Sequence, residues 1–474
     1  MNSPATTANF WTPNWLQHIT GGRWLHEPTD PEQPLTGLGI DSRTLKPGQV
    51  FLAVNGDQFD GHDYVEKALK TGAAIAIIEK NTAPEYTGGG VLHVDNTIDA
   101  LQKLARAYRT SLKQAGCHII AIVGSNGKTT TRHLIHAVLS SRLQGTQSPK
   151  SFNNHLGVPL TILGASLGDD FLVAEVGTNH PGEIDALGEI LKPDAAVITC
   201  IGKEHMAFFK DLHGVANEEA AITQHLPDQG SVFIEADAYC WVRNSPSFNA
   251  KTRVTVYADK DKNKPPDTIQ HGRQRLDIDD TTIDLPLIAP HDRLNALAAV
   301  RVGQAMGVPM DKIKSALENV APMPGRLEVK QLGQVTLIDD SYNANPDSTL
   351  AALDVLAHYT PTPGGRRIAV LADMLELGDI AESSHREVGQ ALAKLFDTNK
   401  IQRAVLIGPD MSLTRDELIH KSHVDNVTHY QEADGSTFDR IADLIQPNDV
   451  VLLKGSRGMQ LERFLPILQA RFTD

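Results

Sequence analysis

The sequence predicts an α/β protein with three domains. Short apolar segments alternate with longer amphipathic ones over most of the 474 residues, which is typical of parallel sheets with helical crossovers. At about 100–200 residues per domain, this length suggests two to four domains. Proline and glycine interrupt the pattern at residues 322–325, and a helical pattern ends near Gly116. The predicted domains are therefore residues 1–116, 117–321 and 322–474.

Apolar runs of four to eight residues predict the strands, and apolar residues at helical spacing predict the helices. The expected strands are residues 73–79, 119–123, 171–176, 195–200, 335–339, 367–372, 403–407 and 450–453. The expected helices are residues 98–114, 129–140, 294–306, 311–320, 348–358 and 384–396. Residues 245–283 are polar, so we expect an irregular, peripheral excursion of the middle domain.

The composition restricts partners and location. With 44 Lys and Arg against 58 Asp and Glu, the formal net charge of −14 disfavours nucleic acid and anionic membrane surfaces as partners. Three scattered cysteines cannot form a disulfide framework, which fits a reducing compartment. Residues 1–16 lack the basic and apolar parts of a signal peptide, and no apolar stretch is long enough to span a bilayer. We expect a cytoplasmic protein without membrane insertion.

A phosphate-binding loop follows the expected strand at residues 119–123. Its residues are Gly124, Ser125, Asn126, Gly127, Lys128, Thr129 and Thr130. Glycines let backbone N–H groups approach phosphate, and the start of a helix favours negative charge. Lys128 would bridge the β- and γ-phosphates of ATP, and Thr129 would bind Mg²⁺. The loop is a shortened variant, because Ile122 stands where the common pattern has glycine; a plain helix start with an exposed lysine is the alternative.

Polar residues at other strand ends extend this prediction. Glu175 and His205 follow apolar runs, and both are candidate Mg²⁺ ligands, although turn residues are common at such positions. His291 and Asn295 share one helix face and could hold a base or ribose, or belong to a solvated helix start.

The third domain has three polar clusters at strand ends, including residues 373–378. Parallel strands end on one rim, so these clusters should lie together and suit an amine and a carboxylate; ordinary turn chemistry is the alternative. The candidates are Asp340, Asn343, Asn345, Lys454 and Arg457.

With these motifs in view, the whole chain resembles the Mur ligases of bacterial cell-wall synthesis. The resemblance depends on residues 41–43, 60–64, 124–130, 151–155, 175–177, 324–328, 340–346, 373–378 and 454–457. The strings at 340–346 and 373–378 resemble the member that adds a dipeptide, rather than the relatives that add one amino acid.

The resemblance implies ATP- and Mg²⁺-dependent joining of D-alanyl-D-alanine to a UDP-N-acetylmuramoyl-tripeptide through an acyl phosphate. The small N-terminal domain would bind the UDP substrate, the central parallel sheet ATP, and the Rossmann-like C-terminal domain the amine. The implied catalytic residues are Lys128, Glu175, His205 and Asn153, and the implied metal ligands are Thr129, Glu175, His205 and Glu219. Nucleotide contacts would come from residues 124–130, His291, Asn295, Arg326 and Asp340. Substrate contacts would come from Ser42, Arg43, Asn153, Asn154, Asn343, Asn345, Lys454 and Arg457.

Two positions depart from the family pattern. Glu219 stands where Mur ligases usually carry a carbamoylated lysine that helps hold a second Mg²⁺. A glutamate supplies a carboxylate unmodified but reaches about 3–4 Å less far. Glu219 either still serves the metal, through a water, or is an exposed helix acid. Pro290 stands where the family tends to have arginine, so the adenosine contacts should differ in detail.

Rival functions are a sister ligase that adds one amino acid or extends folate, and an ATP-hydrolysing switch protein. The polar rim of the third domain argues against a switch, because a switch needs no pocket for an amine. Sequence does not fix the third residue of the peptide or the oligomeric state; a monomer acting on small molecules is our expectation.

Overall fold

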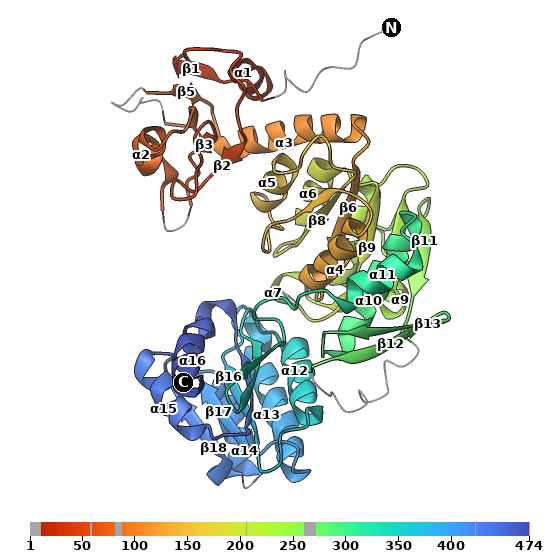
Figure 1. The fold of residues 1–474 in the computed structure, drawn as a ribbon, viewed down its shortest axis with the longest axis vertical. Coiled ribbons are helices and arrows are strands. Elements are labelled where there is room, and N and C mark those ends of the chain that lie inside the picture. Colours follow the sequence, from red (N-terminus) through yellow and green to blue (C-terminus); the bar gives the residue numbers. More distant parts are fainter. Residues whose placement is uncertain are drawn as a thin grey trace.

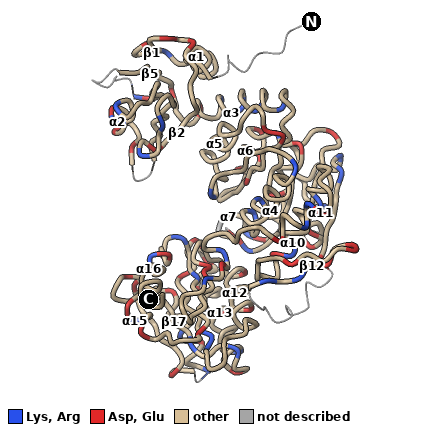
Figure 2. The backbone as a smooth tube through the Cα atoms, in the orientation of Figure 1, with Lys and Arg blue, Asp and Glu red and all other residues tan. Residues whose placement is uncertain are grey.

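The structure, a computed structural model, describes residues 11–56, 59–80, 88–204, 206–259, 272–421 and 423–473. Three sheets with their helices follow one another along the chain, and the middle one lies between the other two (Figure 1). Basic and acidic residues are interspersed over all three parts (Figure 2). Among the helices in these ranges, none combines the length and apolar character needed to span a bilayer.

The first part is a five-stranded sheet of order β1-β5-β4-β3-β2, in which only the β1–β5 pair is antiparallel. Its strands are β1 (Arg23–His26), β2 (Leu38–Gly39), β3 (Val50–Leu52), β4 (Ile75–Ile78) and β5 (Gly90–His93). Its helices are α1 (Pro13–Thr20), α2 (Val65–Lys70) and α3 (Thr97–Gln114). Apolar residues of α3 belong to a core that continues into the middle part, which couples the two.

The middle part is a six-stranded parallel sheet of order β11-β10-β9-β6-β8-β7. Its strands are β6 (His118–Val123), β7 (Gly145–Gln147), β8 (Phe171–Glu175), β9 (Ala195–Ile198), β10 (Ser231–Glu235) and β11 (Arg253–Tyr257), beside a separate hairpin of β12 (Gln274–Ile278) and β13 (Thr281–Leu285). Its helices are α4 (Lys128–Ser140), α5 (Gly157–Leu163), α6 (Glu183–Leu191), α7 (Met206–Phe209), α8 (Leu212–Ala220), α9 (Ala236–Val242), α10 (Pro290–Ala305) and α11 (Met310–Glu318). The central strands are apolar throughout because helices cover both faces of a parallel sheet.

The third part is a six-stranded sheet of order β14-β15-β19-β16-β17-β18, parallel except for β14. Its strands are β14 (Glu328–Leu332), β15 (Val335–Asp340), β16 (Arg367–Ala372), β17 (Arg403–Ile407), β18 (Val427–Tyr430) and β19 (Val450–Lys454). Its helices are α12 (Pro346–His358), α13 (Ala381–Asp397), α14 (Met411–His420), α15 (Gly435–Leu444) and α16 (Leu465–Phe472).

All eight expected strands and all six expected helices are confirmed, with shifts of a few residues at their ends. The expectation of an irregular excursion at residues 245–283 is wrong, although residues 260–271 lie outside the described ranges. β11 extends the central sheet as an edge strand, and β12 and β13 pair with each other. These strands are half exposed, so their apolar residues alternate with polar ones and form no continuous run. The domain boundaries stay predictions.

Candidate active site

The phosphate loop joins β6 to α4 and requires its two glycines. Gly124 and Gly127 have φ angles of 121° and 82°, which side chains disfavour. A Cβ at Gly124 would lie 2.2 Å from the Thr199 hydroxyl, and one at Gly127 would lie 2.6 Å from Oδ1 of Asn295. The loop therefore presents bare backbone at the first turn of α4, where N–H groups have no partner within the helix.

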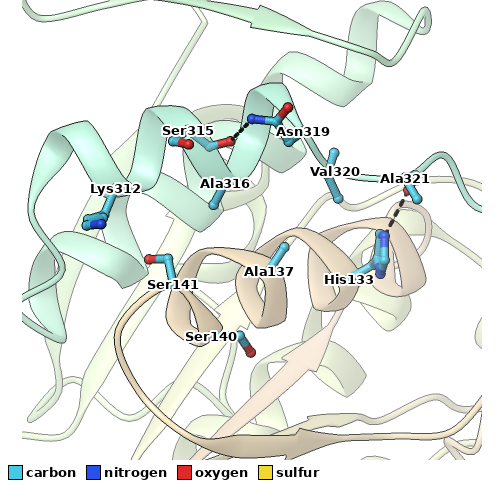
Figure 3. A pocket seen from close by; sticks show the side chains of 10 residues that line it. All are labelled: His133, Ala137, Ser140, Ser141, Lys312, Ser315, Ala316, Asn319, Val320 and Ala321. Carbon is cyan, nitrogen blue, oxygen red and sulfur yellow. Dashed lines mark hydrogen bonds between the residues drawn. The ribbon is translucent and has the colours of Figure 1, made fainter.

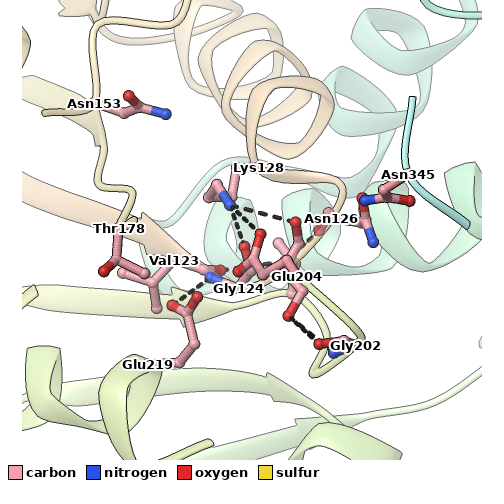
Figure 4. Close-up of polar contacts among 12 residues, drawn as sticks. Val123, Gly124, Asn126, Lys128, Asn153, Thr178, Gly202, Glu204, Glu219 and Asn345 are labelled. Atoms are coloured by element: carbon pink, nitrogen blue, oxygen red, sulfur yellow. Dashed lines mark hydrogen bonds and ion pairs between the residues drawn. The ribbon is translucent and has the colours of Figure 1, made fainter. Parts of the chain in front are cut away.

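Lys128 folds back over this loop. Its Nζ donates to the Gly124 carbonyl oxygen at 2.5 Å and lies 3.6 Å from a carboxylate oxygen of Glu204 (Figure 4). Burial opposes the charge of Lys128, but the carboxylates of Glu204, Glu219 and Glu175 outweigh it and raise the lysine pKa. Lys128 is thus held cationic beside the loop, and the alternative of an exposed lysine is wrong, because its side chain is only 14% exposed.

Glu175 is a buried carboxylate at the end of β8. It accepts hydrogen bonds from the Thr129 hydroxyl at 3.0 Å and from Nδ2 of Asn153 at 3.1 Å. The Arg326 guanidinium donates to the same Thr129 hydroxyl at 3.1 Å. A hydroxyl, a carboxylate and an amide therefore meet beside the first turn of α4. His205, the other predicted ligand from a strand end, lies outside the described residues.

Glu219 is fully buried, so the alternative of an exposed helix acid is wrong. One of its carboxylate oxygens accepts from the Gly124 N–H at 2.7 Å (Figure 4). Its other oxygen, and one oxygen of Glu204, have no hydrogen-bond partner among the described residues. Burial raises the pKa of Glu219 well above its ordinary value, nearby Glu204 raises it further, and Lys128 acts in the opposite direction. The shorter side chain thus reaches the loop directly.

The third part touches the phosphate loop. Asn345, which caps α12 through Oδ1, donates from Nδ2 to Oδ1 of Asn126 at 2.9 Å. The Tyr342 hydroxyl donates to the Ser151 hydroxyl at 2.7 Å, and the Arg326 guanidinium lies 4.3 Å above the Tyr342 ring. The residues that follow β15 are therefore seated on the middle part at the nucleotide loop.

Some of the other predicted rim residues bond to one another, and some are exposed to solvent. Lys454 is 2% exposed, and its Nζ donates to Asp340 at 2.6 Å and to the Asn343 carbonyl oxygen at 3.0 Å. Burial raises the pKa of Asp340, against the opposing effect of Lys454. Arg457 is open, with a side-chain exposure of 62% and an ion pair to Glu462. Lys454 therefore holds the loop in place, whereas Asn343 and Arg457 face outward.

Of the other predicted residues, Asn295 lies against Gly127 of the phosphate loop, whereas the remaining ones are not part of this cluster. Asn295 is buried and accepts from the Thr131 hydroxyl at 3.1 Å, bracing α10 against α4, while His291 is exposed. In the first part, the Arg43 guanidinium pairs with Asp41, whose carboxyl pKa it lowers to about 2. Two further predicted residues also lie elsewhere, Ser42 beside Arg43 and Asn154 at the start of α5, where its Oδ1 accepts from the Gly157 N–H.

Comparison with known proteins decides the family. Residues 34–109 match the model described as Mur ligase family, catalytic domain; residues 122–303 match the Mur ligase middle domain; and residues 325–457 match the Mur ligase, glutamate ligase domain. A Bacillus subtilis protein named UDP-N-acetylmuramoyl-tripeptide–D-alanyl-D-alanine ligase is 32% identical over 93% of this chain and 94% of its own length. An Escherichia coli protein of the same name is 32% identical over 93% of this chain and 95% of its own length.

The chain belongs to the Mur ligase family. A crystal structure of MurF from Acinetobacter baumannii superimposes with a TM-score of 0.81 and 28% identity, covering 97% of this chain and 99% of that one. A MurF ligase from Thermotoga maritima, in complex with ADP, shares the fold with a TM-score of 0.74 at 24% identity, over 92% of this chain and 97% of that one. The three-part α/β architecture of this Mur ligase is thus the predicted one.

Sequence reasoning missed three residues that this Mur ligase places at the cluster. Arg132 lies one helical turn after Lys128, and that i, i+4 spacing was a usable signal. Glu204 directly precedes His205 and was hidden by it. Tyr342 stands inside a recognised string, but its reach to Ser151 depends on how the third part is seated.

A cavity of about 500 Å³ lies apart from these residues, between α4 and α11 (Figure 3). His133, Ser140 and Lys312 are among its lining residues, and no phosphate-loop residue lines it. The His133 ring nitrogen contacts the Ala321 carbonyl oxygen at 2.9 Å, at the beginning of the link to the third part. The candidate active site is the polar cluster rather than this cavity.

Proposed function

We propose that this Mur ligase is a UDP-N-acetylmuramoyl-tripeptide–D-alanyl-D-alanine ligase that forms ADP. The observation that carries the proposal is the contact between the loop after β15 and the phosphate loop, made by Asn345 and Asn126. An amine held by the third part would thereby meet a carboxylate activated at the nucleotide. The names of the relatives from Bacillus subtilis and Escherichia coli support the choice of substrates.

In this proposal the phosphate loop holds ATP. Backbone N–H groups at the first turn of α4 and the Lys128 ammonium would neutralise the phosphates, while the N–H groups of Gly124 and Ser125 bond to Glu219 and Cys200 and hold the loop in shape. Arg326 reaches this site from the third part through its contact with Thr129, and Asp340 lies behind it, bonded to the Leu327 N–H. His291 and Asn295, on the helix packed against α4, would hold the adenosine.

The residues present fit a bound Mg²⁺. The Thr129 hydroxyl and the Glu175 carboxylate already lie 3.0 Å apart, and hard oxygen donors are what Mg²⁺ prefers. A buried oxygen of Glu219 has no hydrogen-bond partner among the described residues, which suits a second ion held by an unmodified carboxylate. When bound, Mg²⁺ would supply charge stabilisation to the phosphoryl group. We assign His205 to the same set from sequence.

The proposed reaction has two steps. A carboxylate oxygen of the tripeptide attacks the γ-phosphorus, the bond to the bridging oxygen breaks, and ADP leaves. The amine nitrogen of the dipeptide then attacks the acyl carbon and loses a proton, and inorganic phosphate leaves. Lys128 holds its positive charge where negative charge develops, and Asn153, hydrogen-bonded to Glu175, orients the peptide end.

Substrate positioning is divided among the three parts. Ser42 and Arg43 of the first part would contact the UDP substrate, with Asn153 and Asn154 leading toward the phosphates. Asn343, Asn345 and Arg457 would contact the dipeptide, and Lys454 would fix the loop that carries them. Closer contact between the parts would exclude water, which would otherwise hydrolyse the acyl phosphate. We place this enzyme in the cytoplasm as a monomer.

Phosphate release tests the proposal. The enzyme is incubated with ATP and Mg²⁺, and the UDP-tripeptide and D-alanyl-D-alanine are added separately and together. We expect release only with both, and a product whose mass equals the joined peptide. Release without either substrate would indicate an ATPase switch, and release when one amino acid replaces the dipeptide would indicate a sister ligase.

A further inference from the structure

Arg132 is a buried cation that the roles above leave unused. It lies on α4, one turn beyond Lys128, and is 3% exposed. Its Nε is buried without a hydrogen-bond partner, and none of the described residues accepts a hydrogen bond from its guanidinium. The nearest opposite charge is a carboxylate oxygen of Glu175, 3.8 Å from Nε. That distance is beyond hydrogen-bond range.

The charge balance around Arg132 favours an additional anion. Glu175 already accepts hydrogen bonds from Thr129 and Asn153, so it does not satisfy the guanidinium. A second guanidinium, that of Arg326, donates to the Thr129 hydroxyl at 3.1 Å beside the same carboxylate. Glu175 is therefore the one carboxylate paired with Arg132 among the described residues, and it lies at the edge of ion-pair range. An arginine stays charged, and a buried charge without hydrogen bonds is costly unless a ligand pairs with it.

Two anionic groups would meet at this site, the phosphates of ATP and the carboxylate of the tripeptide. The position of Arg132 indicates which of the two it binds. ATP is served by the loop and by Lys128, and the adenosine side of α4 faces α10 through Thr131 and Asn295. Arg132 instead faces Glu175 on β8, which pairs with β6 on the side of β7. Asn153 donates to that carboxylate and lies in the loop that leads into α5.

The path from the first part ends at the same place. α5 packs on α3 and touches β2 of the first part (Figure 1). An extended ligand anchored on the first part would pass α5 and Asn153 before it reaches Glu175. The end of such a ligand therefore arrives beside Arg132, and not beside the adenosine.

We propose that Arg132 binds the carboxylate of the UDP-tripeptide that receives the dipeptide, and holds it against the γ-phosphate. This inference rests on the proposed function. A planar guanidinium suits a carboxylate because it donates two parallel hydrogen bonds. Arg132 is thus a substrate-binding residue for the attacking group.

A cycle of enzyme variant and ligand variant tests this contact without turnover. Isothermal titration, with no ATP present, compares the UDP-tripeptide with the same molecule carrying a carboxamide in place of that carboxylate. A hydrogen-bonded charge pair of about 1.5–3 kcal/mol predicts that amidation weakens binding to the wild-type enzyme about 10-fold or more. Arg132→Met keeps the apolar stem but loses the donors, and we expect amidation to change its binding less than twofold. A full amidation penalty in Arg132→Met would overturn the proposal.

Two further variants separate binding from folding. Arg132→Lys keeps the positive charge near Glu175, and we expect an intermediate amidation penalty. If Arg132→Met does not fold, Arg132→Lys decides alone, and a penalty equal to that of the wild type refutes the contact. Arg142→Met is the matched control, since Arg142 is exposed just beyond the same helix, and it should keep the full penalty.

Steady-state kinetics give a second reading. We expect Arg132→Met to raise the KM for the UDP-tripeptide about 10-fold and the KM for ATP less than twofold, as loss of one charged hydrogen-bonded contact predicts. An equal rise in both KM values would assign Arg132 to the nucleotide instead. A wild-type enzyme that does not bind the UDP-tripeptide would refute the proposed function itself, which the titration distinguishes from loss of this one contact.

Discussion

Replacing Glu219 tests whether a plain carboxylate serves where relatives are expected to use a modified lysine. Glu219→Gln keeps an oxygen that can accept from the Gly124 N–H, now 2.7 Å from the carboxylate, but removes the negative charge. The free energy of unfolding should therefore change by less than about 1 kcal/mol, and the repulsion from Glu204 is relieved. If the carboxylate serves a metal, the Mg²⁺ concentration for half-maximal activity should rise about 10–100-fold.

Glu219→Ala separates the structural effect from the metal effect. It leaves the buried Gly124 N–H unpaired, which costs about 1–3 kcal/mol, with a further cost for the cavity left behind. The adjacent Glu218→Gln is the matched control, because Glu218 is buried on the same helix but accepts from the N–H groups of Gly182 and Ile184. It should lower stability by about 1–2 kcal/mol without moving the Mg²⁺ curve.

The assays are thermal or urea unfolding for stability and phosphate release against Mg²⁺ concentration for the metal. A Glu219→Gln enzyme with the wild-type Mg²⁺ curve and wild-type activity would refute the metal role. In that case the carboxylate would only anchor the phosphate loop.

Four other outcomes can be checked. Tyr342→Phe removes the hydroxyl that reaches Ser151 but keeps the ring beside Arg326. Loss of one hydrogen bond of about 1 kcal/mol predicts that kcat falls about fivefold, with an unchanged thermal midpoint of unfolding. An unchanged kcat would count against a role for this contact in catalysis. Burial raises the pKa of the Cys117 thiol to about 12, so iodoacetamide at pH 8 should modify the exposed Cys240 and spare Cys117 in the native protein. Folded Cys117 keeps its proton more tightly than an ordinary thiol, whose pKa is 9.0, so the folded state should lose stability as pH rises above about 9, which unfolding curves at pH 8 and 10 would show. ATP together with the UDP-tripeptide should compact the protein in small-angle scattering, and an unchanged radius of gyration would contradict domain closure.

The local structure and the chemistry of the phosphate loop can be predicted from the amino-acid sequence alone. The apolar runs of β6, β8 and β9 mark strands buried on both faces. Such runs can be identified without knowing which strands lie beside them. Gly124 and Gly127 have positive φ angles, which favour glycine, and both stand close to Lys128 in the sequence. The half-exposed edge strands were harder, because alternation over five residues resembles an irregular polar segment.

Which polar residues meet depends on the packing of the three parts and cannot be read from local patterns. Gly124 and Glu219 are 95 positions apart, and Asn126 and Asn345 are 219 apart, so no local pattern links them. The sequence alone left Glu219 open between a metal-site residue and a surface acid, and burial against the loop excludes the surface acid. The spacing of Arg132 from Lys128 is visible in the sequence, but only packing shows that its Nε is buried without a partner among the described residues. Hydrogen bonds and desolvation act over a few ångströms in space, and only the packed fold fixes those distances.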